Sequence, residues 1–291
     1  MSSALMEKIL VILNPAARSE RAGGTWEKIQ SLPAATVQTT SAPGDARSIA
    51  AWAVGEGFAT VVAAGGDGTI NEVVNGLVGS EVALGILPVG TMNVFAAEIG
   101  LPNNIEKAWE IVQTRHTRRV DLLRANEQYF VQLAGVGLDA QVVQATSRNF
   151  KKNFGPLSYV ISAAQIAARK PPKLIVEHDG MRREGSFVLI GNGRYYGGPV
   201  AFFKDARIDD GKLDVLIFKN LGYLDIARYL GTILMGSHTD LDDVEYFQTK
   251  RVSVSSEDDV PVEVDGEVVA KLPVTFRISS RKLRVVVPIE G

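Results

Sequence analysis

The sequence predicts a two-domain protein in which a doubly wound α/β domain precedes an antiparallel β-sandwich domain, with a cleft between them. Three observations predict this class. The length of 291 residues corresponds to about two domains. Short apolar runs alternate with segments of helical period in the first part, and many strand-like stretches separated by turn signals follow. We place the domains at residues 1–122 and 123–291, and expect the last residues to be able to pack back on the first domain.

The first half contains strand-like and helical segments in alternation. The strand-like runs are Ile9–Leu13, Ala35–Thr39, Thr60–Ala64 and Ala83–Leu87, and the helical segments are Gly44–Gly55 and Thr69–Leu77. Uncharged apolar runs of this length are typical of strands that are covered on both faces of a parallel sheet. The alternation therefore predicts a β-α-β-α succession.

The second half has a different pattern. Its strand-like stretches are Lys173–His178, Ser186–Ile190, Lys212–Phe218, Lys250–Ser255, Val260–Val264, Val274–Ile278 and Lys282–Val287. Asp-Gly pairs at 179–180, 210–211 and 265–266 indicate tight turns between such strands, as in an antiparallel sandwich or barrel. Two helical segments, Pro156–Arg169 and Tyr223–Met235, interrupt the strands.

Composition excludes several classes of protein. With 31 Lys and Arg against 33 Asp and Glu, the net charge of -2 does not suit a dedicated nucleic-acid binder. The absence of cysteine excludes disulfides, thiolate metal sites and a cysteine nucleophile. No apolar run reaches the ~18 residues that a membrane span needs. We expect a cytoplasmic protein whose membrane contact, if it has one, is peripheral at the inner membrane face, and a homodimer is compatible with the sequence.

The segment Gly65-Gly66-Asp67-Gly68-Thr69 follows a predicted strand and opens a helix. Glycines let a ligand approach the backbone, and the exposed amides at a helix start attract anions, so this turn suits phosphate binding. The same stretch is also typical of a capping box between Thr69 and Glu72. Asp67 favours the interpretation of a phosphate-transfer site. A carboxylate beside phosphates is costly unless a metal or a reacting hydroxyl lies between them, and a site of that kind contains one. The turn is neither a Walker A motif nor a dinucleotide fingerprint.

A second glycine-containing turn, Pro88–Asn93, also follows a buried strand and opens a helix. In a parallel sheet, neighbouring strands deliver such turns to the same carboxyl edge, where they can form one site. Thr91 can alternatively be the N-cap of the helix that follows.

The ordered motifs resemble those of the diacylglycerol kinase catalytic-domain family, which includes sphingosine kinases and bacterial soluble lipid kinases. The resemblance rests on ILNPAAR (12–18), TTSAPGDA (39–46), GGDGTINEVVNGL (65–77), GILPVGTMNVFA (85–96), DGKLDVLIF (210–218) and VDGE (264–267). It continues through VDLLRANEQYFVQLAGVGLDA (120–140) and FGPLSYVISA (154–163), so it covers nearly the whole chain in order.

The resemblance implies a lipid kinase that uses ATP and Mg²⁺ to phosphorylate a lipid hydroxyl, such as that of diacylglycerol, at a membrane surface. Matched residue by residue, it implies that ATP is bound by Asn14, Thr40, Gly65, Gly66, Asp67, Gly68, Thr69, Asn71, Glu72, Gly90, Thr91 and Asn93. It further implies Glu267 as proton acceptor, Asp67 and Asp121 in the acidic group around the catalytic Mg²⁺, and Asp265 as a further catalytic residue. The catalytic site would then draw on both domains across the cleft.

A second metal site is implied at Arg207, Asp210 and Lys212, through one carboxylate and backbone carbonyls. Without the resemblance, Asp265-Gly266 and Asp210-Gly211 are each typical of an ordinary hairpin turn.

The second motif departs from the usual family form GTGNDFAR, because Met92, Val94 and Ala97 replace its glycine, aspartate and arginine. This keeps open an alternative in which the chain is a catalytically weak nucleotide- or lipid-binding protein on the same scaffold. A further alternative is a phosphotransferase similar to NAD kinase, a family that shares GGDGT.

The segment Arg148–Phe154 combines cations with aromatic residues and suits contact with anionic lipid headgroups, although a solvated basic turn has the same composition. Arg115–Arg119 is interpreted as a solvated charge run.

Overall fold

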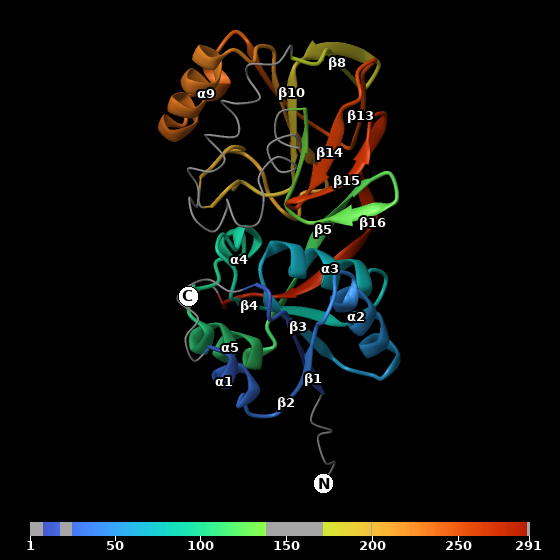
Figure 1. Ribbon diagram of the computed structural model, residues 1–291, viewed down its shortest axis with the longest axis vertical. Coiled ribbons are helices and arrows are strands. Elements are labelled where there is room, and N and C mark those ends of the chain that lie inside the picture. The colour runs from blue at the N-terminus through green and yellow to red at the C-terminus, as the bar shows by residue number, and fades with distance from the viewer. Residues whose placement is uncertain (1–7, 18–24, 138–170, 199, 290–291) are drawn as a thin grey trace. The chain divides into compact units, whose positions relative to one another are not determined.

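The computed structural model describes residues 8–17, 25–137, 171–198 and 200–289 (Figure 1). The chain divides into two compact units, of which the first comprises residues 1–120 and 280–291 and the second residues 121–279. Both ends of the chain thus contribute to the first unit. The predicted helix Pro156–Arg169 and the basic segment Arg148–Phe154 lie outside the described residues.

The first unit contains a parallel sheet with helices on both faces. Its elements are β1 (Ile9–Leu13), α1 (Thr25–Gln30), β2 (Ala35–Thr39), α2 (Asp45–Gly55), β3 (Thr60–Gly65), α3 (Asp67–Leu77), β4 (Ala83–Pro88), α4 (Val94–Glu98) and α5 (Ile105–Thr114). The strand order is β2-β1-β3-β4, and each pairing is parallel. The end of β16 (Val274–Val286) extends the sheet beside β4 through Val285 and Leu84.

Successive residues of the buried strands face opposite sides of the sheet, and each side is covered by helices. α1 and α5 place Ile29, Trp109 and Val112 against the face that Val11 and Val62 form. α2 and α3 pack together and against β1 and β3 on the other face (Figure 1). The absence of charge from these strands follows from this double coverage.

The second unit is an antiparallel sandwich. Its further elements are β5 (Thr117–Ala125), β6 (Gln128–Phe130), β7 (Leu133–Val136), β8 (Leu174–His178), β9 (Met181–Gly185), β10 (Phe187–Gly191), β11 (Leu213–Phe218), α9 (Tyr223–Met235), a 3₁₀ turn (His238–Asp240), β12 (Val244–Thr249), β13 (Arg251–Ser255), β14 (Pro261–Val264) and β15 (Glu267–Lys271). One sheet has the order β12-β11-β10-β7-β14-β15, and the other joins β16, β13, β8 and β9, with β5 and β6 beside β16.

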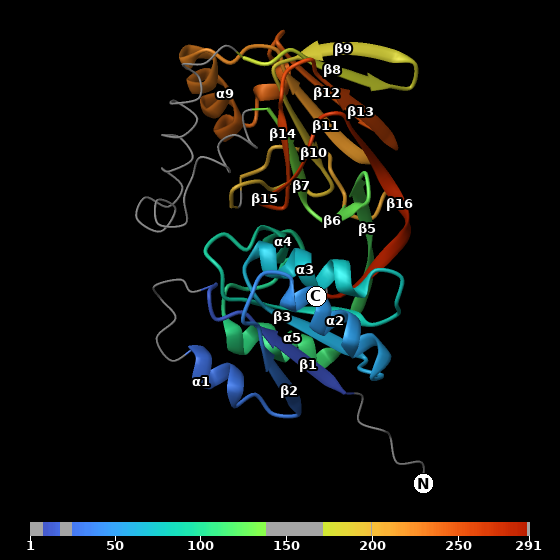
Figure 2. The ribbon, with the colours of Figure 1, turned by 45° about the vertical axis from the view of Figure 1, so that its right-hand side comes forward.

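The core of the sandwich lies between these two sheets. Ile190, Val215 and Val262 from the first sheet and Val254 and Phe276 from the second belong to one buried cluster. A second cluster lies on the other face of the six-stranded sheet, where α9 contributes Tyr229 and Ile233. Figure 2 shows α9 beside the strands of this sheet. The predicted fold class, an α/β part followed by an antiparallel sandwich, is confirmed.

Two predictions about the elements are wrong. Val274–Ile278 and Lys282–Val287 are not two strands but parts of the single strand β16. The Asp210-Gly211 turn precedes β11 and does not join two strands of a hairpin. The charge run Arg115–Arg119 is exposed except for the half-buried Thr117, as expected, and it contains the start of β5, where Arg119 pairs with Glu81 at 2.7 Å.

Candidate active site

The carboxyl ends of four parallel strands carry the predicted nucleotide residues of the first unit. Asn14 follows β1, Thr40 follows β2, Gly66 follows β3 and Gly90 lies two residues after β4. Strands that run in parallel end at the same edge of the sheet, so these positions lie together. The structure thus brings the predicted nucleotide residues to one edge.

The two glycine turns contact each other through their backbones. A Cβ atom at Gly90 would lie 2.5 Å from the Cα atom of Gly66, and one at Gly66 would lie 3.5 Å from the Cα atom of Gly90. The N–H groups of Val89 and Gly90 both donate to the carbonyl of Gly65 at 3.2 Å. Position 90 therefore has no room for a side chain, because any Cβ there overlaps backbone.

Asn14 connects β1 to the first glycine turn. Its amide Nδ2 donates to the Thr69 hydroxyl at 2.8 Å, and its Oδ1 accepts from the N–H of Ala16. A Cβ atom at Gly65 would lie 2.4 Å from that same Thr69 oxygen. Gly65 is therefore required for Thr69, which is 5% exposed, to reach its partner.

Helix α3 begins directly in the turn, with Asp67 as its first residue and Gly66 as its N-cap. Because Gly66 has no side chain, it caps no amide, and the first N–H groups of the helix are a favourable place for an anion. The alternative capping box is wrong. Thr69 accepts from Asn14, and the Glu72 carboxylate accepts from the N–H groups of Gly44 and Ala46 at the start of α2.

The second turn is stabilised by its own side chains. Asn93 adopts a positive φ of 48° and its amide closes a ring on Gly90, donating to the carbonyl and accepting from the N–H. Asp67 Oδ1 accepts from the N–H of Phe95 at 3.4 Å, which joins the two turns. Asn93, and not Thr91, is the N-cap of α4, so that alternative is also wrong. Thr91 is exposed beside the turn.

Further side chains order the neighbourhood of Thr40, which is buried and donates its N–H to the carbonyl of Leu13. Asp45 accepts from the hydroxyl and N–H of Ser41 and from the N–H of Ala42. These bonds, first of all that of the Ser41 hydroxyl, lower the pKa of the Asp45 carboxyl. Asn71 is buried within α3, with its carbonyl bound by Asn75.

In the second unit, Asp265 and Gly266 form the two-residue turn between β14 and β15. Both have positive φ, at 46° and 90°, as a type I′ hairpin turn requires. The Asp265 carboxylate accepts from the backbone N–H groups of Val131, Gln132 and Leu133 at 3.0–3.1 Å. Asp265 therefore anchors the hairpin to the start of β7, and the exposed residue Glu267 begins β15 directly after it.

Glu263, which the sequence analysis did not single out, also belongs to this hairpin. It is 1% exposed, and its carboxylate accepts from the N–H of Gly266. The sequence does not reveal this burial, because Glu263 alternates with Val262 and Val264, which face the sandwich core, and so points to the opposite face of the sheet. The Asp-Gly-Glu turn is thus held by the carboxylates of Glu263 and Asp265, which both precede its glycine.

Asp121 is fully buried and tied to the predicted second metal site. Its Oδ2 accepts from the N–H of Gly211 at 2.7 Å, and its own N–H donates to the carbonyl of Ile208. Asn192, also missed from sequence, donates through Nδ2 to the carbonyls of Asp121 and Val131. Since Val131 donates to Asp265, one hydrogen-bonded path links the two predicted acids.

The turn at 207–212 contains oxygen atoms that could hold a magnesium ion, namely the Asp210 carboxylate and backbone carbonyls. The Asp210 carboxylate folds back to accept from the N–H of Lys212, which brings the carboxylate and the backbone of the turn together. Nearby, burial raises the pKa of the Asp214 carboxyl, and the charges of Asp210 and Asp205 add to this effect. Within the described residues Asp214 Oδ2 has no hydrogen-bond partner. A cation at Asp210 would relieve this accumulation of negative charge.

The described ranges contain no cluster of three acidic or histidine side chains suited to a metal. Mg²⁺ commonly retains several waters and is held by one or two carboxylates together with substrate phosphates, so a kinase site does not need such a cluster.

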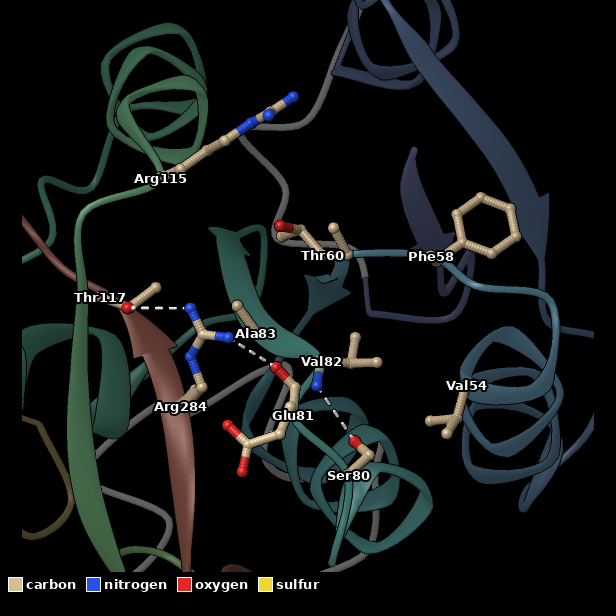
Figure 3. A pocket seen from close by; sticks show the side chains of 11 residues that line it. Val54, Phe58, Thr60, Ser80, Glu81, Val82, Ala83, Arg115, Thr117 and Arg284 are labelled. Atoms are coloured by element: carbon tan, nitrogen blue, oxygen red, sulfur yellow. Dashed lines mark hydrogen bonds between the residues drawn. The ribbon is translucent and has the colours of Figure 1, made fainter. Parts of the chain in front are cut away.

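A cavity of about 420 Å³ lies elsewhere in the first unit, at the amino ends of β3 and β4 (Figure 3). Arg284 crosses its wall, donating to the carbonyl of Glu81 at 2.9 Å and to the Thr117 hydroxyl at 3.4 Å. Because it opens at the opposite ends of the strands from the glycine turns, it is not part of the candidate active site.

Comparison with known proteins identifies the family of this chain. Residues 8–125 match the model of the diacylglycerol kinase catalytic domain, and residues 132–287 match that of the YegS C-terminal NAD kinase beta sandwich-like domain. The chain belongs to the diacylglycerol kinase catalytic-domain family. The resemblance of the motifs is thereby confirmed, and this diacylglycerol kinase-like chain is an enzyme of the kinase phosphotransferase class.

Individual relatives cover most of this diacylglycerol kinase-like chain. A diacylglycerol kinase of Staphylococcus aureus (strain JH9) is 33% identical over 250 residues, 84% of this chain and 79% of that protein. Two crystal structures of a provisionally assigned diacylglycerol kinase from Bacillus anthracis str. Sterne are each 26% identical. The first has a TM-score of 0.81, and the match covers 99% of this chain and 98% of that chain. The second has a TM-score of 0.80, and the match covers 97% of each chain.

Proposed function

We propose that this chain is an ATP- and Mg²⁺-dependent lipid kinase that transfers the γ-phosphoryl group of ATP to the hydroxyl of a lipid such as diacylglycerol. The observation that carries the proposal is the backbone contact of Gly66 with Gly90 beside the start of α3, at the carboxyl edge of the sheet. The name of the S. aureus relative supports the choice of lipid.

The first unit binds the triphosphate through main-chain N–H groups. The turn at 65–69 contains no lysine, so backbone amides and the positive end of α3 supply the attraction for the phosphates. Asn14 and Asn93 have their amides engaged in holding the turns, so they orient the backbone that binds ATP. Thr40 and Thr91 flank this backbone at the same edge.

Magnesium, when bound, neutralises charge that develops on the transferring phosphoryl group. Asp67 and Asp121 are the carboxylates that we assign to the catalytic ion. The Asp210 carboxylate and the carbonyls of Arg207 and Lys212 would hold a second, structural ion.

Glu267 accepts the proton of the lipid hydroxyl in this proposal. A lipid hydroxyl is a poor nucleophile at neutral pH, so a carboxylate positioned to take its proton speeds the transfer. Asp265 and Glu263 act through Glu267 as positioning residues, because their carboxylates hold the backbone of the turn that precedes it.

We accordingly assign nucleotide binding to residues 1–122 and lipid binding to residues 123–291, and propose that the enzyme works in the cytoplasm, in peripheral contact with the inner membrane face. No helix in the described ranges has the length and apolar character needed to cross a bilayer.

The test is a kinase assay with labelled ATP, Mg²⁺ and mixed micelles of diacylglycerol, phosphatidylglycerol or sphingoid lipids. We expect a labelled phospholipid with at least one acceptor, diacylglycerol first. The match to an NAD kinase-like sandwich gives NAD as the second candidate acceptor, so NADP formation is assayed in parallel. Binding of Mg-ATP with no transfer to any acceptor would contradict the proposal and indicate a nucleotide-binding protein without turnover.

A further inference from the structure

Helix α9 exposes large apolar side chains to the outside. Its inner side buries Ile226, Tyr229 and Ile233, the last two in the cluster on the six-stranded sheet. Its outer side exposes Tyr223 by 56%, Leu224 by 86%, Leu230 by 36%, Leu234 by 76% and Met235 by 75%. These five are half of the ten large apolar side chains that are exposed in the described ranges. A surface helix of a globular protein normally places charged residues there.

The exposed residues form one continuous stripe. At about 100° per residue, Leu230, Tyr223, Leu234, Leu224 and Met235 fall within an arc of roughly 140° on the side away from the sheet. Ala227 and Gly231 occupy the remaining positions of that arc and leave the leucines prominent. We call this surface the α9 stripe.

The polar residues of α9 hold the helix in this orientation. Arg228 and the Tyr229 hydroxyl both donate to the Asp243 carboxylate, and Asn220, just before the helix, donates to the same group at 2.8 Å. These contacts lie beside the α9 stripe, so the helix cannot turn its leucines inward without breaking them.

Cations lie beside the stripe together with carboxylates, since Arg228 contacts both Asp225 and Asp243. Lys219 precedes the helix and Arg228 lies along its edge, although each is also paired with a carboxylate, Glu245 and Asp243 respectively. Lys204 lies at the other end, with its Cε atom 3.6 Å from the position of a Cβ on Gly236. Basic residues that flank an apolar stripe match the headgroups of anionic lipids.

We propose that the α9 stripe is the surface by which this protein docks on a phospholipid bilayer. The helix has 13 residues and is about 20 Å long, shorter than the ~30 Å hydrocarbon core, so it lies in the plane of the interface and does not cross. The inference rests on the proposed function in one respect, because diacylglycerol carries two acyl chains and is presented by a bilayer.

A second copy of the chain fits the stripe less well. One face of this helix measures about 20 Å by 10 Å, well below the ~800 Å² that each partner of a stable complex buries.

The first experiment measures binding to phosphatidylcholine–phosphatidylglycerol vesicles that contain no diacylglycerol, in the absence of ATP. The double variant Leu224→Glu with Leu234→Glu should bind at least about tenfold more weakly than the unaltered chain, because two apolar contacts are replaced by charges that the headgroups repel. The control carries Met181→Glu and Ile289→Glu, which add the same charge at exposed apolar positions outside α9, and should bind as the unaltered chain does.

The second experiment locates the contact directly. The chain has no cysteine, so Leu224→Cys introduces a single site for an environment-sensitive fluorophore. Addition of vesicles should shift its emission to the blue, whereas a fluorophore at Met181→Cys should remain in water. A label at position 224 that stays in water while the protein binds vesicles would overturn the proposal, as would equal binding by the double variant.

Both readouts are independent of phosphoryl transfer, so failure of the lipid kinase proposal and failure of the docking proposal are distinguishable. Analytical ultracentrifugation of the same variants tests the alternative that a second copy of the chain covers the α9 stripe. If the unaltered chain is a dimer and the Leu224→Glu, Leu234→Glu variant is a monomer, the α9 stripe is an interface between copies and the bilayer proposal is wrong.

Discussion

Single residues determine whether the two glycine turns can contact each other. A Cβ at position 90 would overlap the Cα of Gly66 and lie 2.8 Å from Asn93 Oδ1, so Gly90→Ala must displace backbone. We expect Mg-ATP affinity to fall by about tenfold or more, since the amides of both turns move from their positions. Isothermal titration calorimetry measures the affinity.

The same substitution at Gly231 is the matched control. A Cβ there meets no atom within 4 Å and the position is inside α9, so Gly231→Ala should leave Mg-ATP affinity unchanged and stabilise the chain by up to about 1 kcal/mol. An equal affinity for Gly90→Ala and the unaltered chain would show that the contact between the turns is irrelevant to nucleotide binding.

Asp265 offers a second test at this scale. Its carboxylate accepts from three buried N–H groups. In Asp265→Asn one carboxylate oxygen is replaced by an NH₂ group, which cannot accept from an N–H. We expect about 2–3 kcal/mol of lost unfolding free energy and a fall in kcat, with Mg-ATP affinity retained.

Urea unfolding and steady-state kinetics measure these effects of Asp265→Asn. Asp259→Asn is the control, because it breaks only the exposed pair with Lys271 near the other end of the same hairpin and should cost less than about 1 kcal/mol. Comparable losses for both variants would contradict the anchoring role of Asp265.

The sequence predicts some of these residues better than others. The Asp265-Gly266 turn is predictable, because two positive φ angles in a two-residue loop favour this dipeptide. Asn192 is not, because its partners are carbonyls of Asp121 and Val131, which are far from it in the chain.

At the scale of elements, Glu72 joins α3 to α2. Its carboxylate accepts from the N–H groups of Gly44 and Ala46, which would otherwise lack an intrahelical partner. Glu72→Ala should therefore lower the unfolding free energy by about 1–2 kcal/mol, a value typical of a lost cap. Glu72→Gln keeps one acceptor oxygen and should lose less. Thermal unfolding separates the two variants, and equal melting temperatures for both and for the unaltered chain would exclude this capping.

Asp243 makes the anchoring of α9 depend on pH. Burial alone would raise the pKa of the Asp243 carboxyl, but hydrogen bonds from Tyr229, Arg228 and Asn220 outweigh it and lower that pKa to about 2. Because the pKa is lower in the folded than in the unfolded chain, the carboxylate contributes about 2 kcal/mol above pH ~4, and this contribution is lost as the pH falls through ~2.

Asp243→Asn should therefore cost about the same unfolding free energy at pH 7 and pH 5, and less at pH 3. Urea unfolding at the three values measures the difference, with the exposed neighbour Asp242→Asn as control. A cost that is independent of pH down to 3 would contradict the assignment.

Two of the elements that the sequence analysis did not predict correctly are polar or long. β9 (MRREG) is an edge strand with mostly exposed charged residues, so no apolar alternation marks it. β16 contains the polar run Ser279–Lys282, which resembles a turn but continues as a strand. By contrast, the buried strands β1, β3 and β4 are predictable, because an uncharged apolar run of five or six residues is typical of a buried strand.

At the scale of the whole molecule, the sequence does not predict which strands pair when they are far apart in the chain. The last residues of β16 complete the sheet of the first unit beside β4, about two hundred positions away in the chain. The order of the nucleotide motifs along β1, β2, β3 and β4 is predictable, because parallel strands deliver their ends to one edge.

The most direct test of the whole account is the turnover of Glu267→Gln with Mg-ATP and diacylglycerol micelles, measured beside its affinity for Mg-ATP. The account predicts phosphatidate formation by the unaltered chain and a fall in kcat of about 10²–10⁴ in the variant, because its amide cannot accept the hydroxyl proton. Mg-ATP affinity should not change. Undiminished phosphatidate formation by Glu267→Gln would contradict the account.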